Sequence, residues 1–526
     1  MLMSMAHSII KSGSRLSLLT MGSRILGLVR EMTKAAFLGT SALSDAFTIA
    51  FFIPNLLRRL FAENSISVAF IPTFRQYLDN ESPQKIKEFL SATFTVIALA
   101  TSLTVVAGII GAPLIIPFFG TGTDETVLLT RMMFPYLAII SLAAFFQGIL
   151  NGIRVFSPTG FTPILFNLVI IGSTWLFSSF TGNPARAMAI GVLLGGTVQA
   201  AFQLPFVLKA GFRFKPVNPL VALSDPGTKT VLHLIGPTVI GMAAYQINDL
   251  VSSILASNAG TGIVSSLQYS LRLQELILGV FAVSIGTVIL PDLSSHAAKE
   301  QWDLFTRLLS RAMNIIAFIT IPVTFFSLVF GQSLITLLFK TRSFSDDSVA
   351  LTLNAFTFHV MGLYCIALNR IISPAFYAKK DTKRPTIAGL FSFCANIILA
   401  LLLVGPMRGG GIALALSLAS AVNTACLLYF LGKTKTVELG PFLRNTASYA
   451  GKITLFSAVS ACPLWYFKEY LLTPFANLGR IAGNAIPITL GFGVFLLIFV
   501  LQLCMTKDPV LTSLRERLSG TKRSDY

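Results

Sequence analysis

The chain has 526 residues, of which 54% are hydrophobic and 12% are charged. Soluble domains carry roughly twice that charged fraction, and the mean hydropathy of this chain is +0.75. Because a water-facing surface needs charged side chains that this chain lacks, soluble enzymes, nucleic-acid-binding proteins and disordered scaffolds are excluded. Its apolar runs, such as FLSATFTVIALATSLTVVAGIIGAPLIIPF, are continuous and do not alternate. They indicate a helical membrane protein and not a β-barrel.

The net charge of +18 comes from 40 Lys and Arg against 22 Asp and Glu. In a membrane protein such an excess reports topology, because Lys and Arg are retained in cytoplasmic loops and the cytoplasmic leaflet is anionic. We therefore expect no nucleic-acid partner. The five cysteines lie far apart in apolar runs and the four histidines form no cluster, so the sequence predicts neither a disulfide framework nor a metal site.

Apolar segments of about twenty or more residues predict about fourteen spans. The first contains the moderately apolar stretch after Lys11 and Arg15, which has no small-residue cleavage site and is therefore interpreted as a span and not as a signal peptide. The predicted spans cover residues 16–38, 43–76, 88–117, 127–152, 156–179, 186–208, 230–257, 263–291, 304–330, 348–374, 385–405, 409–431, 446–467 and 480–504.

An even number of spans places both termini on the same side of the membrane. Loops after even-numbered spans are rich in Lys and Arg, whereas loops after odd-numbered spans are short and carry the acidic pairs Asp124/Glu125 and Asp346/Asp347. The positive-inside rule therefore predicts that both termini are cytoplasmic.

Three motifs recur in the same order and at nearly the same separation along the chain. The pairs are AFIPTF with VILPDL, GAPLIIPFF with GQSLITLLF, and DETVLLTRMMF with DDSVALTLNAF. Six spans separate the partners, so the two halves point the same way, as in transporters whose halves rock to alternate access. The predicted parts are an N-terminal six-helix half at 1–215, a second half at 216–435, additional helices 13 and 14 at 436–505, and a basic cytoplasmic tail at 506–526.

The first predicted span carries a polar stripe. At about 100° per residue its charged side chains fall on one arc, away from Ile25. Lys34 and Arg30 can reach the membrane surface by snorkelling. Arg24 lies well within the segment, where an ionisable group is costly and usually faces a watery cavity or a partner. The arc comprises Arg24, Arg30, Glu31 and Lys34.

The second predicted span also carries charges, in PNLLRRLFAE. Asn55 and Arg59 are four residues apart, as are Arg59 and Glu63, so each pair shares a helix face. Pro54 should kink the helix before the arginines. Because Arg58 and Arg59 cannot both point the same way, one of them can pair with Glu63 for a purely structural reason.

The eighth predicted span contains Arg272 and Glu275, three residues apart. They can form an internal salt bridge or contact a ligand, and both alternatives stay open. If the arginines of spans one, two and eight converge, the central cavity is cationic. Arginine binds phosphate and carboxylate through two parallel hydrogen bonds, so the implied cargo is an anion.

Several of these runs together resemble a known family. The sequence is similar to the MurJ (MviN) lipid II flippases of the MOP exporter superfamily over essentially its full length. The runs are SRILGLVREMTKAAFLG, SDAFTIAFFIPNLLRRLFAENSISVAFIPTF, SLRLQELILGV, GTVILPDLS and PAFYAKKDTKRPT.

The resemblance implies an all-α transporter of the bacterial inner membrane, and not an enzyme. Such a protein moves lipid II, the undecaprenyl-pyrophosphate-linked peptidoglycan precursor, to the outer leaflet through an arginine-lined central cavity, in support of cell wall biogenesis and cell shape. The implied partners are lipid II and membrane lipids, with the cell-wall synthesis machinery as a further candidate. No cofactor is implied, and the candidate energy source is the membrane potential or a monovalent ion.

The resemblance also implies a set of substrate-binding residues. Leu271 departs from members that carry an acidic residue just before the arginine of span eight. Some members bind sodium through spans seven and eleven, where Asp249 and Asn396 are the nearest candidates, but Ala400 stands where a carboxylate is expected, so a complete sodium site is not implied. The substrate-binding set is Ser23, Arg24, Arg30, Asp45, Asn55, Arg58, Glu63, Arg272 and Glu275.

Two alternatives remain beside this interpretation. An exporter of another lipid-linked oligosaccharide of the same superfamily also needs a cationic cavity, because its cargo carries a pyrophosphate. An intramembrane enzyme acting on polyprenyl-linked sugars needs a general base or metal-binding acids in a sizeable outer loop, and the predicted outer loops are short.

Overall fold

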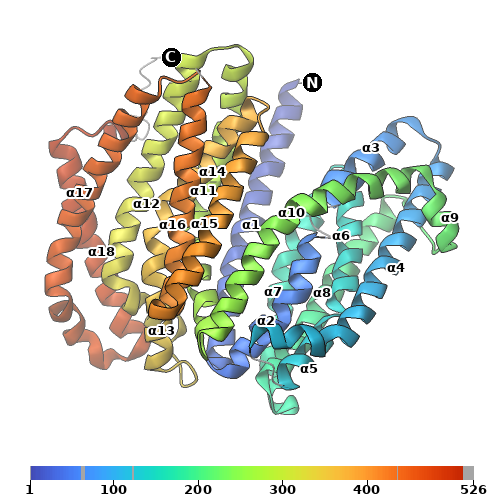
Figure 1. Cartoon of the computed structure of the whole chain (residues 1–526), viewed down its shortest axis with the longest axis horizontal. Helices are drawn as coiled ribbons and strands as arrows, with labels where there is room; N and C mark the ends of the chain where they lie inside the picture. Colours follow the sequence, from blue (N-terminus) through green and yellow to red (C-terminus); the bar gives the residue numbers. More distant parts are fainter. Residues whose placement is uncertain (1, 61–65, 121–123, 435, 513–526) are drawn as a thin grey trace. The chain divides into compact units, whose positions relative to one another are not determined.

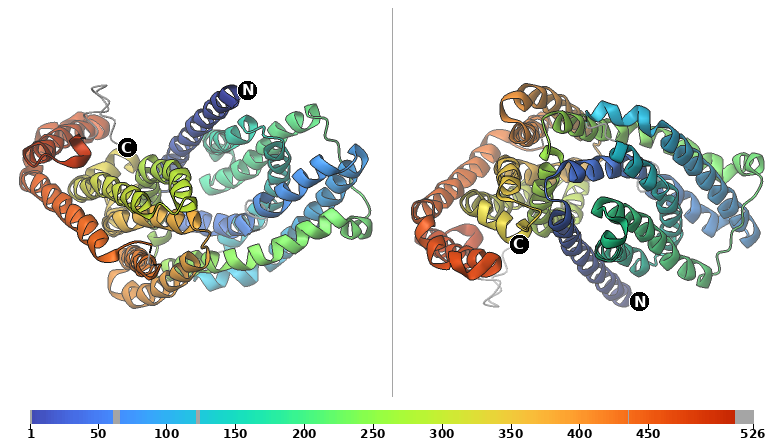
Figure 2. Two further views of the ribbon diagram at one scale, coloured as in Figure 1. Left: turned by 90° about the horizontal axis from the view of Figure 1, so that it is seen from above. Right: turned by 90° about the horizontal axis from the view of Figure 1, so that it is seen from below.

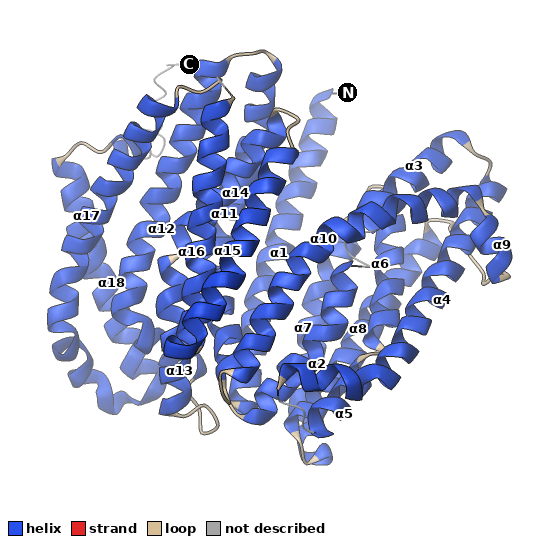
Figure 3. Ribbon diagram, viewed as in Figure 1, coloured by secondary structure: helices blue, strands red, loops and turns tan. Residues whose placement is uncertain are grey.

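The computed structural model describes residues 2–60, 66–120, 124–434 and 436–512 of the chain (Figure 1). Every element of regular secondary structure in these ranges is a helix, and none of them contains a β-strand (Figure 3). The predicted all-α class is confirmed.

The helices form two compact units, residues Met1–Ser265 and Ser266–Tyr526. The first unit contains α1 (Leu2–Leu38), α2 (Ala42–Arg58), η2 (Ile66–Phe70), α3 (Ile71–Asn80), α4 (Pro83–Ile115), η3 (Ile116–Phe119), α5 (Asp124–Met133), α6 (Tyr136–Gly152), α7 (Ser157–Thr181), α8 (Pro184–Lys209), α9 (Pro219–Ser224) and α10 (Pro226–Asn258). The helix α11 (Ile263–Ala298) begins at the end of this unit and continues into the second.

The second unit continues with seven α-helices and one 3₁₀ helix in its described residues. They are α12 (Trp302–Phe339), α13 (Asp346–Met361), α14 (Leu363–Ala378), α15 (Lys383–Met407), α16 (Gly409–Lys433), α17 (Leu439–Leu472), η4 (Thr473–Leu478) and α18 (Gly479–Met505). Helices α9 and α10 belong to the first unit. The predicted boundary between residues 215 and 216 is based on the internal repeat. The division into two compact units does not test that repeat, so the boundary stays a prediction.

Each predicted span coincides with one helix or with a broken run of helices. In the described ranges, eight helical stretches are long and apolar enough to cross a membrane, or nine if the bent pair α13–α14 forms one span. The stretch Leu439–Met505 combines α17 and α18, which were predicted as two spans. Helices α1, α2, α10 and α11 are not among these stretches, but each lies where a span is predicted.

Several helices begin with the local signals that favour a helix start. The side-chain oxygen of Ser82 accepts from the backbone N–H of Lys85, and Pro83 occupies the first position of α4. Asn183 and Asp225 cap α8 and α10 in the same way, each followed by a proline. A side chain at the cap satisfies an otherwise free N–H, and a proline at the first position has none to satisfy.

Small residues let α7 and α8 pack closely in the first unit (Figure 2). A Cβ atom added at Gly191 of α8 would lie 3.1 Å from the Cα of Ile170, and one at Gly195 would lie 2.8 Å from the ring of Phe166. Close approach through small residues is how membrane helices gain packing energy without a hydrophobic driving force. This pair forms the support against which α1 packs.

The predicted spans 127–152 and 348–374 each contain a short interruption of the helix. In the first unit α5 ends at Met133 and α6 begins at Tyr136, with Pro135 between them. In the second unit α13 and α14 meet at Gly362 with a bend of 43°. Interrupted helices of this kind are common in transporters, where they lie near substrate sites.

Candidate functional site

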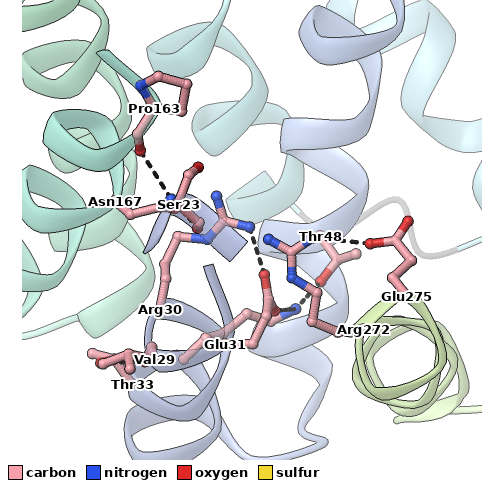
Figure 4. Close-up of polar contacts among 11 residues, drawn as sticks. Ser23, Val29, Arg30, Glu31, Thr33, Thr48, Pro163, Asn167, Arg272 and Glu275 are labelled. Carbon is pink, nitrogen blue, oxygen red and sulfur yellow. Dashed lines mark hydrogen bonds and ion pairs between the residues drawn. The ribbon is translucent and has the colours of Figure 1, made fainter. Parts of the chain in front are cut away.

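The polar stripe of α1 is an ion network inside the first unit. The Nη2 atom of Arg30 lies 2.7 Å from Oε1 of Glu31, and Nζ of Lys34 lies 4.0 Å from Oε2 of the same carboxylate (Figure 4). The side chains of Arg30, Glu31 and Lys34 are 18%, 6% and 4% exposed. Asp45 of α2 also interacts electrostatically with Lys34, so two carboxylates face the two cations of this network and balance charges that are expensive in an apolar environment.

Lys34 connects this network to α2. Its Nζ donates to Oγ1 of Thr48 at 2.6 Å, and the Thr48 hydroxyl donates to the carbonyl of Ser44 at 2.7 Å. Lys34 is thus buried and hydrogen-bonded to a neighbouring helix. Its side chain does not snorkel to the membrane surface, the alternative that the sequence left open. The contact fixes the rotation of α1 against α2.

Arg24 differs from the other cations of the stripe. Its side chain is half-buried, and in the described part of the chain no carboxylate or other group pairs with its guanidinium. The backbone beside it is fixed, because Nδ2 of Asn167 donates to the carbonyl of Ser23 at 3.3 Å and to that of Pro163 at 2.9 Å (Figure 4). The α1–α7 contact therefore fixes the backbone from which the Arg24 side chain extends.

The second helix presents further cations near its end. Nε of Arg58 donates to Oδ1 of Asn55 at 2.9 Å, so these two predicted site residues are in contact. Nη1 of Arg59 lies 3.3 Å from Oδ2 of Asp249 on α10. The predicted site residue Glu63 lies outside the described residues, so its pairing with either arginine stays a prediction.

Asp45 is placed differently from the other predicted site residues. Its side chain is 1% exposed. Oδ2 accepts from the backbone N–H of Gly262 at 2.6 Å, and Oδ1 accepts from that of Ser265 at 2.8 Å. Asp45 thus caps the first turn of α11, where a carboxylate satisfies free N–H groups and complements the helix dipole.

In the second unit, α11 presents Arg272 and Glu275. Nη1 of Arg272 lies 2.9 Å from Oε2 of Glu275, so the internal salt bridge is present (Figure 4). The Nε atom of Arg272 is buried and has no hydrogen-bond partner. A buried donor without a partner is costly, and the salt bridge thus leaves part of the hydrogen-bonding capacity of Arg272 unused.

The residues considered for sodium lie in different units, Asp249 in the first and Asn396 in the second, and sodium binding stays a prediction. Asp249 pairs with Arg59, and Asn396 and Ala400 are buried on α15. In the described ranges no group of three or more His, Cys, Asp or Glu side chains could hold a metal ion.

Three residues of the α1–α2 network were not in the predicted site. Glu31 and Lys34 lie on the predicted polar arc, so the helical periodicity could have included them. No sequence pattern indicates Thr48 as a site residue, because the hydroxyl of a threonine in an apolar helix usually bonds to the backbone of its own helix. Its contact with Lys34 depends on how α1 packs against α2.

Comparison with known proteins places these features in a family. A family model described as "Lipid II flippase MurJ" matches residues 34–482. The chain belongs to the MurJ family. A probable lipid II flippase MurJ of Treponema pallidum is 46% identical over 507 residues, which cover 95% of this chain and 96% of the relative.

Solved structures agree with this assignment. A MurJ lipid II flippase in an inward closed conformation superposes with a TM-score of 0.77 at 26% identity, over 94% of this chain and 99% of that one. An inward-facing multidrug resistance MATE family transporter of the MOP superfamily shares the fold, with a TM-score of 0.60 at 17% identity over 81% of this chain and 94% of that one. The resemblance to the MurJ family is confirmed, and the chain is a multi-pass inner-membrane protein.

Proposed function

We propose that this MurJ family member is a lipid II flippase that moves the undecaprenyl-pyrophosphate-linked precursor from the cytoplasmic to the outer leaflet by alternating access. The observation that carries the proposal is the guanidinium of Arg24, which is half-buried on the polar stripe of α1 and has no partner in the described residues. A pyrophosphate matches such a site in charge and geometry. The relatives named as lipid II flippases support lipid II as the cargo.

In this mechanism the site first opens to the cytoplasm, the side on which both termini lie. Arg24 and Arg30, together with Arg58 and Arg272, bind the pyrophosphate and the acidic peptide, while the polyprenyl chain stays in the lipid phase. A conformational change then exposes the headgroup outside, and the loss of its contacts releases it.

Transport of labelled lipid II in vesicles of purified, reconstituted protein tests the proposal. We expect Arg24→Ala to lower the flipping rate at least about tenfold, because a charged hydrogen bond contributes about 1.5–3 kcal/mol. Arg213→Ala, which removes an exposed loop arginine without a partner in the described residues, is the matched control and should flip normally. Normal flipping by Arg24→Ala, with unchanged protein incorporation, would refute the assignment of the site.

The strongest rival cargo is another lipid-linked oligosaccharide that also carries a pyrophosphate. Expression in cells depleted of their own lipid II flippase separates the two, since only transport of lipid II restores growth and cell shape. Failure to restore growth, combined with flipping of a different polyprenyl-linked glycan in vesicles, would favour the rival.

A further inference from the structure

The break between α13 and α14 is held by side chains from three other helices of the second unit. Backbone carbonyls at membrane depth need hydrogen-bond partners, and a break in a helix leaves some of them free. Three consecutive carbonyls in the last turn of α13 each accept a side-chain donor. Thr324 of α12 bonds to Val360 at 3.1 Å, Ser417 of α16 bonds to Phe358 at 2.7 Å, and the amide of Gln274 of α11 bonds to His359.

His359 makes a second contact with α11. Its Nδ1 atom lies 2.6 Å from Oγ of Ser270. Ser270, Gln274 and His359 are 0%, 3% and 1% exposed. Because Ser270 and Gln274 are four residues apart, they share one face of α11. His359 of α13 therefore contacts two successive turns of α11. Its ring contacts Ser270, and its backbone carbonyl accepts from Gln274.

Arg272 lies on the opposite face of the same helix. At about 100° per residue it points about 200° away from Ser270. Its side chain is 28% exposed, in contrast to the buried face that contacts His359. A rotation of α11 about its own axis would therefore move the guanidinium of Arg272 away from its present direction, and the contacts of His359 oppose this rotation.

We propose that His359 is a positioning residue for Arg272, which it holds in its ligand-binding direction through Ser270 and Gln274. The proposal rests on the proposed function for the role of Arg272, but the direction of that side chain can be measured without any cargo. If His359 only stabilised the α13–α14 break, removing any side-chain bond to that break would have the same effect on the direction of Arg272. Thr324 provides that comparison, since it bonds to the adjacent carbonyl from α12 and does not touch α11.

The experiment measures how fast a cysteine at position 272 reacts with a water-soluble thiol reagent. Full-length Arg272→Cys protein, with the five native cysteines replaced by alanine, is reconstituted in vesicles without lipid II. We expect His359→Leu and Ser270→Ala each to change the reaction rate about fivefold or more, the scale of one buried hydrogen bond. His359→Asn, whose amide can bond to Ser270, should restore the rate to within about twofold, and Thr324→Val should leave it unchanged.

Unchanged labelling in His359→Leu and Ser270→Ala overturns the proposal, as does an equal change in Thr324→Val. If His359→Leu fails to fold, Ser270→Ala carries the test, because it removes only one hydroxyl. Lipid II binding by Arg272→Ala in the native background is measured in parallel. If labelling responds to Ser270→Ala but Arg272→Ala binds lipid II normally, His359 positions Arg272 and it is the ligand contact of the proposed function that fails.

Discussion

At the scale of single residues, the charges inside the helices differ in how they are compensated. Lys34 and Arg30 share one carboxylate, Arg59 has its own, and Arg24 has no partner in the described part of the chain. An unpaired cation in an apolar environment is destabilising, and its retention is explained when a ligand supplies the counter-charge. Arg24 is therefore the residue on which ligand binding should depend most.

Asp45 is expected to contribute mainly to stability. Asp45→Ala removes both acceptors from the N–H groups of Gly262 and Ser265 at the start of α11, which should cost about 1–3 kcal/mol. Thermal unfolding of the purified protein in detergent measures this loss. Asp292→Ala, an exposed acid of the same helix without a partner in the described residues, is the control. Equal melting temperatures for the two variants would contradict the capping role.

Lys379, beyond the end of α14, predicts a pH dependence. Its Nζ lies 5.5 Å from the ring centroid of Trp302 and donates to Thr434 at 3.0 Å. Burial lowers the pKa of Lys379 to about 8, against about 10.4 in an unfolded chain. Between these values the unfolded chain binds more protons, so this group should make the protein more stable as the pH rises from about 8 to about 10.

Melting temperatures across that pH range test the prediction in the wild type and in Lys379→Met. Other groups titrate in both proteins, so the difference between them isolates Lys379. Lys380→Met, at the exposed neighbouring position, should behave like the wild type. An identical pH dependence in Lys379→Met and the wild type would contradict the burial of the amine.

At the scale of elements, the close approach of α7 and α8 determines where α1 can pack. A side chain at Gly191 would come within 3.1 Å of the backbone of Ile170, so Gly191→Ala should force the helices apart and cost about 1–3 kcal/mol. Gly172 of α7 has open space around it, and Gly172→Ala should be neutral or stabilising by up to about 1 kcal/mol. Thermal unfolding of the two single variants makes the comparison, and a loss in both would argue against a specific contact at Gly191.

The break between α13 and α14 also depends on the helices that pack against it. Beside the bend at Gly362, donors from three helices bond to carbonyls in the last turn of α13. Hydropathy predicts one continuous span at 348–374, since it responds to apolar content and not to backbone hydrogen bonding. The sequence contains no proline at this break, and the bend depends on partners that are distant in the chain.

At the scale of the whole molecule, the proposed cargo carries negative charge across the membrane. We expect an inside-negative potential to accelerate outward flipping, since about 2.3 kcal/mol is available per charge at 100 mV. Vesicles with a potassium gradient and valinomycin allow the rate to be measured with and without the potential. Vesicles containing the Arg24→Ala protein control for leakage of the lipid, and a rate independent of the potential would indicate another source of energy.

Much of the fold could be predicted because hydropathy acts locally. A run of apolar residues long enough to span a bilayer becomes a helix there, since no other local structure satisfies its backbone. The helices α4, α12 and α15 therefore lie where the spans were predicted. The polar arc of α1 was also predictable, because residues three or four apart share a helix face.

The partners of the charged residues could not be predicted in the same way. Asp45 was expected among the ligand-binding residues and is engaged with the start of α11, and Asp249 was considered for sodium and pairs with Arg59. In each case the two groups come from helices far apart in the chain. The energies of such pairs depend on distance and burial, which a one-dimensional pattern does not contain.

The sequence by itself determined that the protein lies in a membrane, where its helices run and which helices carry cations, because transfer of side chains into lipid depends on composition over short segments. Only the tertiary structure decided which cations are neutralised. It pairs Arg30 with Glu31, bonds Lys34 to Thr48 and leaves Arg24 without a partner in the described residues. Compensation of charge needs contact within a few ångströms, and the packing of the helices creates that contact.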